Sequence, residues 1–302
     1  MRIVFMGTPE FAVPSLAQLL QAGYDIRAVV TAPDKPAGRG LRVSESAVKK
    51  FSLQHQLRVI QPLRLRDEQF LKELTSLQPD LQVVVAFRML PEPVWSFPPL
   101  GTINLHASLL PDYRGAAPIN WAIINGEKET GLTTFFIEKE IDTGRIIFQQ
   151  RMSIGEEETA GELHDRMKIA GAGLVLKTVQ AIERGEAPAV PQDPALAIHQ
   201  APKLTREMCR IEWTRSANTV FNHIRGLSPY PGAWTLLDGK IFKILRAQKQ
   251  HVAHAHPPGL FLFQDHELRV AVPDGYILPL EVQLEGKKRL PVGEFLKGYI
   301  RQ

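Results

Sequence analysis

The chain has 302 residues, of which 44% are hydrophobic and 23% charged, and it carries a formal net charge of +4 at pH 7. These values exclude a disordered chain and are typical of a globular protein with one large domain and a smaller one. No apolar run approaches the roughly 20 residues of a membrane span, and no basic leader precedes the first apolar run, so a cytoplasmic address without membrane contact is expected.

The first part of the chain alternates short apolar runs with helical patterns, which is typical of an α/β fold with a wound parallel sheet. A helix is predicted over residues 11–20, between the first two strands. A longer helix is predicted from Thr159 to Arg184, with Thr159 and Glu162 as a capping box and Gly185 as its terminator. The predicted strands cover residues 3–6, 26–31, 81–87, 101–106 and 132–137.

The last part of the chain has a different pattern. Residues 188–204 contain four prolines and no periodicity, which indicates a linker between a domain over residues 1–187 and a second domain over residues 205–302. A small β-barrel is predicted there from short β-like runs at residues 234–237, 240–245, 259–263 and 268–272.

Charge is distributed unevenly between the two parts. Residues 203–302 hold 15 Lys and Arg against 9 Asp and Glu, whereas residues 1–202 hold 21 against 23. Such an excess is typical of a domain that contacts a polyanion such as a nucleic acid, and simple solubility remains the alternative.

Three features argue against common cofactor sites. Gly7 ends the first strand, but it is the only one of the three glycines of a dinucleotide fingerprint, so a tight turn is favoured over a nicotinamide site. The single cysteine, Cys209, excludes an internal disulfide and a cysteine-built metal site, and a buried thiol is expected. The cluster His251, His254 and His256 has no accompanying carboxylate or cysteine spacing, so a solvated loop is favoured over a metal site.

Polar side chains interrupt the apolar strand that ends at His106. Alternation along an extended segment places Asn104 and His106 on one face and Ile103 and Leu105 on the other. An amide donor and a titratable imidazole on one face suit attack on a carbonyl, because one can stabilise an oxyanion and the other can exchange a proton. A structural histidine and a strand-ending asparagine remain the alternatives.

Asp142 lies in the turn after the strand predicted at 132–137. Wound sheets bind ligands where strands end, so this carboxylate is a candidate to orient the imidazole of His106 or to hold a proton-carrying water. The alternative is an ordinary turn aspartate before Thr143 and Gly144. No Ser or Cys pairs convincingly with the imidazole, which favours direct transfer over a covalent intermediate.

Taken together, these residues resemble the folate-dependent formyltransferases, and the resemblance covers nearly the whole chain. Several such enzymes share the motifs Asn104-x-His106, Ser108-Leu-Leu-Pro111 and Asp142-Thr-Gly144. The branch that acts on methionyl-tRNA is indicated by the segments Arg114-Gly-Ala-Ala-Pro118, Pro33-Asp-Lys-Pro-Ala-Gly-Arg-Gly40 and Gly226-Leu-Ser-Pro-Tyr-Pro-Gly-Ala233. The resemblance implies a Rossmann-like wound parallel sheet of formyltransferase type, followed by a small OB-like β-barrel.

By this resemblance, the co-substrate is 10-formyltetrahydrofolate and the acceptor is the free amine of initiator methionyl-tRNA. Asn104 and His106 are expected to stabilise the tetrahedral oxyanion, while Asp142 positions the imidazole and assists proton transfer. A monomer with no metal and no tightly bound cofactor is expected. The folate pocket is expected to involve Ser108, Leu109, Leu110, Pro111, Ala86, Phe87, Arg88, Met89 and Leu90.

The glycine-rich segment from Asp34 to Arg42 resembles the loop with which the family contacts the acceptor end of tRNA. Lys35, Arg39 and Arg42 are the predicted contacts, with Arg39 favoured because a guanidinium binds phosphates and bases in a bidentate manner. An exposed charged loop is the alternative. The basic second domain is expected to hold the tRNA backbone.

Three positions depart from the family pattern. The segment Ala86-Phe-Arg-Met-Leu-Pro91 is one residue shorter than in many relatives and carries Arg88 in place of a small residue. Asp112 occupies a position that is often basic, and Asn120-Trp121 resembles the branch that acts on amino sugar nucleotides. A sugar-nucleotide formyltransferase is therefore one alternative function, and a non-catalytic RNA-binding protein is a second alternative from a different class.

Overall fold

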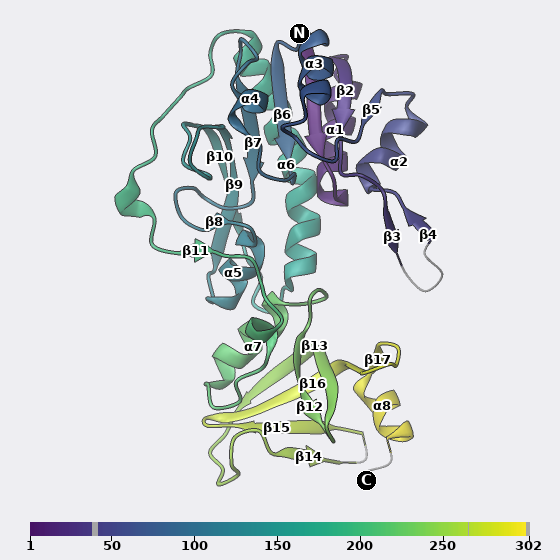
Figure 1. Ribbon diagram of the computed structural model, residues 1–302. Helices are drawn as coiled ribbons and strands as arrows, with labels where there is room; N and C mark the ends of the chain where they lie inside the picture. Colours follow the sequence, from purple (N-terminus) through teal and green to yellow (C-terminus); the bar gives the residue numbers. More distant parts are fainter. Residues whose placement is uncertain (38–41, 265, 300–302) are drawn as a thin grey trace. The chain divides into compact units, whose positions relative to one another are not determined.

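The computed structural model describes residues 1–37, 42–264 and 266–299 (Figure 1). The chain forms two compact units, which are described separately below. Unit 1 comprises residues 1–114, 131–152 and 164–200, and unit 2 comprises residues 115–130, 153–163 and 201–302. Residues 115–130 and 153–163 thus group with the last third of the chain. The domain boundaries at residues 187 and 205 stay a prediction.

Unit 1 is built on a seven-stranded sheet with the order β10-β9-β7-β6-β1-β2-β5. The pairs β1/β2, β1/β6, β2/β5 and β6/β7 are parallel, and β7/β9 is antiparallel. The strands are β1 (Arg2–Gly7), β2 (Asp25–Val30), β5 (Val59–Ile60), β6 (Leu81–Val85), β7 (Thr102–His106), β9 (Glu129–Phe136) and β10 (Ile146–Ser153). The predicted wound parallel sheet is confirmed, with two further strands, β5 and β10, that sequence patterns did not indicate.

The central strands of this sheet are covered on both faces. Ile3 and Phe5 of β1 are fully buried on one side, and Val4 and Met6 are fully buried on the other. The second pair packs in a cluster with Leu74 and other side chains from the flanking helices. This double burial explains why the strands read as continuous apolar runs.

Helices connect and flank these strands. They are α1 (Val13–Gln21), α2 (Ala47–Gln54), α3 (Glu68–Ser76), α4 (Glu92–Trp95) and α6 (Ala160–Glu183), of which the first four residues belong to unit 2. The helix α5 (Pro118–Ile124) belongs to unit 2. The predicted capping box at the start of α6 is confirmed, because the Thr159 amide donates to Glu162 Oε2 at 2.9 Å and the Glu162 amide donates to Thr159 Oγ1 at 3.3 Å. Gly185 follows this helix at φ +70°, a conformation that favours glycine.

Short elements complete the connections. They are β3 (Lys35–Ala37), β4 (Arg42–Ser44), β8 (Arg114–Gly115), β11 (Gln200–Ala201) and the 3₁₀ turns η1 (Glu10–Ala12), η2 (Pro194–Leu196) and η3 (Glu207–Cys209). Strands β3 and β4 pair with each other, and β8 pairs with β11.

Unit 2 contains a curled antiparallel sheet with the order β12-β13-β16-β15-β14, and β17 pairs with β16. Its elements are α7 (Ala217–Gly226), β12 (Ala233–Leu237), β13 (Lys240–His251), β14 (Phe261–Phe263), β15 (Leu268–Val272), β16 (Gly275–Leu284), β17 (Leu290–Pro291) and α8 (Val292–Gly298). The β12–β13 turn contains Asp238 and Gly239 at φ +49° and +72°, as expected for an Asp-Gly hairpin. The predicted OB-like β fold is confirmed.

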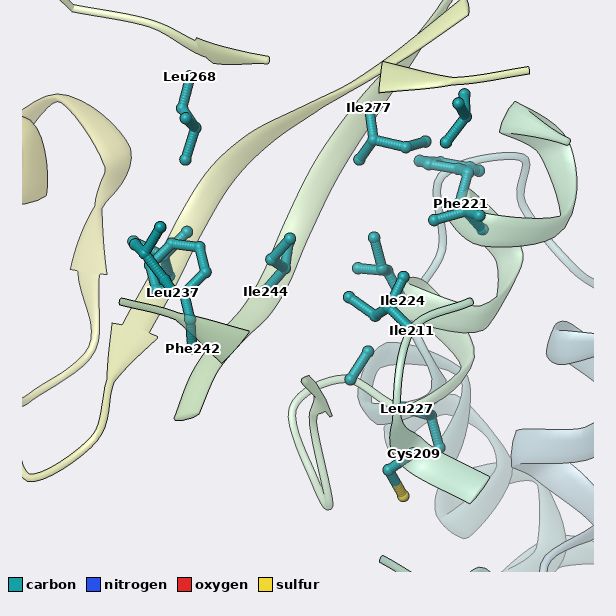
Figure 2. Close-up of a cluster of buried hydrophobic side chains, with 14 of the residues drawn as sticks. Cys209, Ile211, Phe221, Ile224, Leu227, Leu237, Phe242, Ile244, Leu268 and Ile277 are labelled. Carbon is teal, nitrogen blue, oxygen red and sulfur yellow. The ribbon is translucent and has the colours of Figure 1, made fainter. Parts of the chain in front are cut away.

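An apolar cluster fills this second unit (Figure 2). Phe242 and Ile244 of β13 are fully buried, and Phe221 and Ile224 of α7 belong to the same cluster. The Phe242 ring lies 5.2 Å from the ring of Phe295 on α8, centre to centre. Helices α7 and α8 therefore both pack against the apolar face of this sheet.

Candidate active site

Strand β7 places Asn104 and His106 near the carboxyl end of the parallel sheet. Asn104 pairs in register with Phe135 of β9, and His106 pairs with Thr133. Because β7 is a regular strand, residues two apart share a face, as the alternation predicts. The side chain of Asn104 is half-buried and has no hydrogen-bond partner within the part of the chain that the structure describes. Its amide is available to a bound molecule.

His106 is 7% exposed, and each ring nitrogen faces an oxygen of the protein. Nε2 lies 2.9 Å from the Tyr113 carbonyl, which accepts only, so Nε2 carries a hydrogen and donates it. Nδ1 lies 3.8 Å from Oδ2 of Asp142. The Tyr113 carbonyl thus fixes the tautomer, and Nδ1 is the nitrogen that gains or loses a proton beside the carboxylate.

The turn that carries Asp142 is locally constrained. Asp142 has φ +56°, a left-handed conformation that aspartate tolerates better than most residues. A Cβ on Gly144 would meet the Phe136 carbonyl oxygen at 1.7 Å, so only glycine fits this close approach to the end of β9. The Phe136 amide also donates to the Arg145 carbonyl at 2.9 Å. This local packing brings the turn back toward the sheet and toward β7.

The loop after β7 contains the predicted folate-binding residues Ser108, Leu109, Leu110 and Pro111. The Ser108 hydroxyl donates to the Asp112 carbonyl at 2.7 Å, and the side chains of Ser108 and Leu110 are buried. Thr133 Oγ1 accepts from the Leu110 amide at 3.1 Å and donates to the Ser108 carbonyl at 2.7 Å. Gln149 Nε2 donates to the Leu110 carbonyl at 2.8 Å. Strands β9 and β10 therefore hold this loop by its backbone.

The other predicted folate-binding segment follows β6, the neighbour of β7. Ala86 is exposed at φ +47°, Phe87 and Arg88 are half-buried, Met89 is 76% exposed, and Leu90 belongs to the core. The two predicted segments thus follow the carboxyl ends of adjacent parallel strands, which is where wound sheets bind ligands. Folate contact by these residues stays a prediction.

Arg88 ties this segment to the chain after β5. Its Nη1 donates to the Leu63 carbonyl at 3.0 Å, and its Nη2 donates to the Pro62 carbonyl. The guanidinium carbon lies 5.5 Å from the centre of the Phe87 ring, within cation–π range. Partial burial lowers the pKa of Arg88. The unusual arginine of the shortened segment is therefore a bridge between two loops.

Two of the three predicted tRNA-binding residues belong to strands that pair with each other. Lys35 belongs to β3 and Arg42 belongs to β4, and these strands pair with the register Lys35 to Ser44 and Ala37 to Arg42. Arg39 lies outside the described residues. Directly before β3, Asp34 accepts from Lys49 and from Gln61 Nε2, and these bonds hold the pKa of its carboxyl below the usual range. The three tRNA contacts stay a prediction.

The remaining singled-out residues have structural partners. Asp112 Oδ2 lies 3.0 Å from His199 Nδ1, so the acidic residue at this often basic position forms a pair within the protein. His254 Nε2 bonds the Gly275 carbonyl at 2.7 Å, and its Nδ1 accepts from the His256 amide. Cys209 is buried, and burial raises the pKa of its thiol. A Cβ on Gly7 would meet Ala12 at 2.7 Å, which supports the tight-turn interpretation.

Within residues 1–37, 42–264 and 266–299, no group of three or more His, Cys, Asp or Glu side chains is arranged to hold a metal ion. No helix formed by these residues is both long and apolar enough to cross a membrane.

Sequence patterns missed several residues that support the site. Tyr113 acts through its carbonyl, and Thr133 and Gln149 act through bonds to loop backbone, so no side-chain motif marks them. Gln192 donates to the Asp142 carbonyl at 2.9 Å, although it lies in the segment predicted to be a linker. In the sequence, a single glutamine among prolines gives no indication that it supports the site.

Comparison with known proteins identifies the family. A family model for formyl transferases matches residues 1–179, and a second model for the formyl transferase C-terminal domain matches residues 203–300. The chain is 49% identical to methionyl-tRNA formyltransferase of Bacteroides fragilis over 308 aligned residues, covering 99% of this chain and 95% of that protein. It is 50% identical to the protein of the same name from Flavobacterium johnsoniae, covering 99% and 96%.

Solved structures agree in fold. An N-formyltransferase from Helicobacter canadensis, in complex with folinic acid and dTDP-3-aminofucose, matches with a TM-score of 0.68 and 20% identity, covering 92% of this chain and 98% of that chain. HypX from Aquifex aeolicus, in complex with tetrahydrofolic acid, matches with a TM-score of 0.69 and 20% identity, covering 99% of this chain and 48% of that chain. On the family models and the high identity of the full-length relatives, the chain belongs to the formyl transferase family.

Proposed function

We propose that this protein transfers the formyl group of 10-formyltetrahydrofolate to the α-amine of methionyl-tRNA and so supports translation initiation. The observation that carries this proposal is the geometry at the end of β7, where His106 Nδ1 faces the Asp142 carboxylate at 3.8 Å and Asn104 lies on the same strand face. The methionyl-tRNA formyltransferases that align with about half of their residues identical, over nearly the full chain, support the choice of acceptor.

The carbonyl chemistry falls to Asn104. The methionine amine attacks the formyl carbon, a C–N bond forms, and the carbonyl oxygen gains negative charge in the tetrahedral intermediate. The Asn104 amide is the donor for this oxyanion because His106 Nε2 is already bonded to the Tyr113 carbonyl. A preorganised donor of this kind costs no reorganisation when the charge develops.

Proton transfer falls to His106 and Asp142. The attacking amine must lose a proton, and N10 of the folate must gain one when the C–N10 bond breaks and tetrahydrofolate leaves. Nδ1 of His106 is the ring nitrogen that can carry this proton, and Asp142 Oδ2 lies beside it. No covalent bond to the enzyme forms, because the amine itself is the nucleophile.

The two segments after β6 and β7 are proposed to bind the folate. Met89 is 76% exposed and Ala86 is exposed, so this segment presents apolar surface and backbone groups to solvent at the sheet edge. Arg88 ties the first segment to the Leu63 carbonyl, and Thr133 ties the second segment to β9 through the Ser108 carbonyl. Ser108 and Leu110 are buried, so their proposed contribution is to shape the pocket through the backbone.

The acceptor is proposed to contact the segment of β3 and β4 and the basic unit 2. Lys35, Arg39 and Arg42 are the proposed phosphate or base contacts. Strand β13 adds Lys240, Lys243, Arg246 and Lys249, although Arg246 also pairs with Glu162 and Lys243 bonds the Pro231 carbonyl. Contacts between such side chains and the phosphates of the tRNA supply affinity, and this affinity falls steeply as the salt concentration rises. A cytoplasmic monomer is part of the same proposal.

Transfer of labelled formyl from 10-formyltetrahydrofolate tests the proposal. Initiator methionyl-tRNA, the same tRNA without methionine, and an amino sugar nucleotide serve as parallel acceptors. Label on the methionine of the charged tRNA alone is the expected result. Label on the sugar would replace the acceptor and keep the reaction class, and label on none of the three would contradict the activity itself.

A further inference from the structure

Residues 190–199 form a strap that runs past the candidate active site, and Figure 1 shows it as part of the long connection between α6 and β11. Val190 exchanges two backbone hydrogen bonds with Ile146 of β10, at 2.8 and 3.0 Å. At the other end, the His199 carbonyl accepts from the Tyr113 amide at 2.9 Å. The strap is therefore anchored to unit 1 at both ends.

Exposure singles out two strap residues. Every residue from Pro191 to Ile198 is exposed except Gln192, which is half-buried, and His199 is also half-buried. These two are the strap residues that bond to the neighbours of His106 and Asp142. His199 holds Tyr113, whose carbonyl accepts from His106, and Gln192 holds the turn of Asp142.

The Gln192 amide uses its whole hydrogen-bonding capacity on the site. Its Nε2 donates to the Asp142 carbonyl at 2.9 Å and to the Gly144 carbonyl at 2.8 Å. Its Oε1 accepts from Arg114 Nη2 at 2.6 Å and from Arg114 Nε at 3.1 Å. A guanidinium only donates, so Arg114 forces the oxygen of the amide toward itself and the NH2 group toward the turn.

One of these bonds holds the residue of the turn that has an unfavourable backbone conformation. Asp142 has φ +56°, a conformation that disfavours residues with a side chain, and its carbonyl is one of the two that Gln192 holds. The turn is thereby kept in the conformation that presents the Asp142 carboxylate 3.8 Å from His106. Arg114 adds charge assistance, which strengthens a hydrogen bond of this type.

We infer that Gln192, oriented by Arg114, is a positioning residue that holds the catalytic carboxylate of Asp142 against His106. The inference rests on the proposed function and deepens it, because it assigns a role to a residue outside the proposed folate-binding and tRNA-binding segments. Arg114 and Asp142 lie in separate motifs, and Gln192 is the residue that joins them.

The test combines steady-state kinetics with a double-mutant cycle. Gln192→Ala is expected to lower kcat for formyl transfer about 10- to 100-fold, since a displacement of about 1 Å at a catalytic group costs this much. The KM values for both substrates are expected to stay within about twofold, because Gln192 lies outside the segments proposed to bind them. In an Asp142→Ala background, Gln192→Ala is expected to cause no further loss.

Gln192→Glu separates positioning from a general effect on the strap. The carboxylate keeps the acceptor for Arg114 and the side-chain volume, so thermal unfolding is expected to stay near that of the wild type. It loses both donors and faces two carbonyls, so kcat is expected to fall at least as far as in Gln192→Ala. Gln180→Ala, on the exposed face of α6, is the matched control and is expected to keep wild-type kinetics.

The possible failures are distinct. Wild-type protein that transfers no formyl to methionyl-tRNA would overturn the proposed function and, with it, this role. Active wild type together with a Gln192→Ala variant of normal kcat would overturn the positioning role alone. Equal fold-losses for Gln192→Ala with and without Asp142 would also overturn it, because they would show an effect independent of the carboxylate.

Discussion

Nδ1 of His106 lies 3.8 Å from Oδ2 of Asp142, while Nε2 of the same ring donates to the Tyr113 carbonyl at 2.9 Å. The imidazole is thus held between a group that fixes its tautomer and a carboxylate that can balance its charge. This arrangement divides the proposed chemistry, with oxyanion stabilisation by Asn104 and proton transfer by the His106–Asp142 pair. The division can be tested residue by residue.

Substitution of the β7 side chains should separate chemistry from binding. Asn104→Ala is expected to lower kcat about 10²- to 10³-fold, the usual loss for one oxyanion donor, and His106→Ala is expected to abolish measurable transfer. Affinity for methionyl-tRNA, measured by filter binding, should stay near that of the wild type. Near-normal turnover by either variant would contradict the mechanism.

Arg39→Ala should act on the acceptor. We expect a several-fold rise in the KM for methionyl-tRNA and a salt dependence of binding that is less steep by about one phosphate contact. The KM for 10-formyltetrahydrofolate should not change. Arg66→Ala removes an exposed arginine and serves as the control. An unchanged salt slope would assign Arg39 to the ordinary charged surface.

Arg88→Ala should act on the folate side through the loop. The variant loses the bonds to the Pro62 and Leu63 carbonyls that hold the segment after β6. We expect the KM for 10-formyltetrahydrofolate to rise about three- to tenfold, with the KM for methionyl-tRNA unchanged. The exposed Arg66→Ala variant is again the control. Wild-type donor kinetics in Arg88→Ala would show that the segment keeps its conformation without this bridge.

The ion pair between Arg2 and Asp80 predicts a pH dependence of stability. The Arg2 side chain and its backbone N–H lower the pKa of Asp80 to about 2. A carboxyl with a depressed folded-state pKa stabilises the fold above its unfolded-state pKa, and this contribution is lost as the pH falls toward 2. Asp80→Asn should lower the free energy of unfolding by about 1 kcal/mol at pH 7, after allowance for partial exposure.

Urea denaturation at pH 7 and at pH 2.5 checks this prediction. The difference between wild type and Asp80→Asn should shrink at the lower pH, because the wild-type carboxyl is then partly protonated. Asp25→Asn, at the start of the neighbouring strand and 54% exposed, is the control and should have little effect at either pH. A constant difference between the two pH values would contradict the assigned cause.

Phe242→Ala should destabilise unit 2. Phe242, which is labelled in Figure 2, is fully buried. Its ring packs near the rings of Phe261 and Phe295, so the variant loses buried apolar surface and leaves a cavity. We expect the free energy of unfolding of this unit to fall by about 3–5 kcal/mol. Leu236→Ala, 47% exposed on β12, should cost far less. Equal losses in the two variants would show that the cluster is not the source of the stability.

Local sequence patterns were sufficient wherever the deciding interactions are local. The alternation of Asn104 and His106 and the capping box of Thr159 and Glu162 were both confirmed, since each depends on residues within one element. The sequence patterns did not predict strand β10, because its residues 149–151 are polar, and they did not predict β5, because it is only two residues long.

The sequence by itself determined the α/β sheet, the β-rich second part and the residue types that a formyl transfer requires. The tertiary structure alone decided that the Asp142 turn returns to His106, that Tyr113 sets the tautomer of the imidazole, and that Gln192 joins the turn to Arg114. The physical reason is that the contacts of Asp142 with His106 and of Gln192 with Arg114 join segments far apart in the chain, and the Tyr113 contact is made by a backbone carbonyl. Their geometry depends on the order of the strands and on backbone carbonyls, which no side-chain pattern encodes.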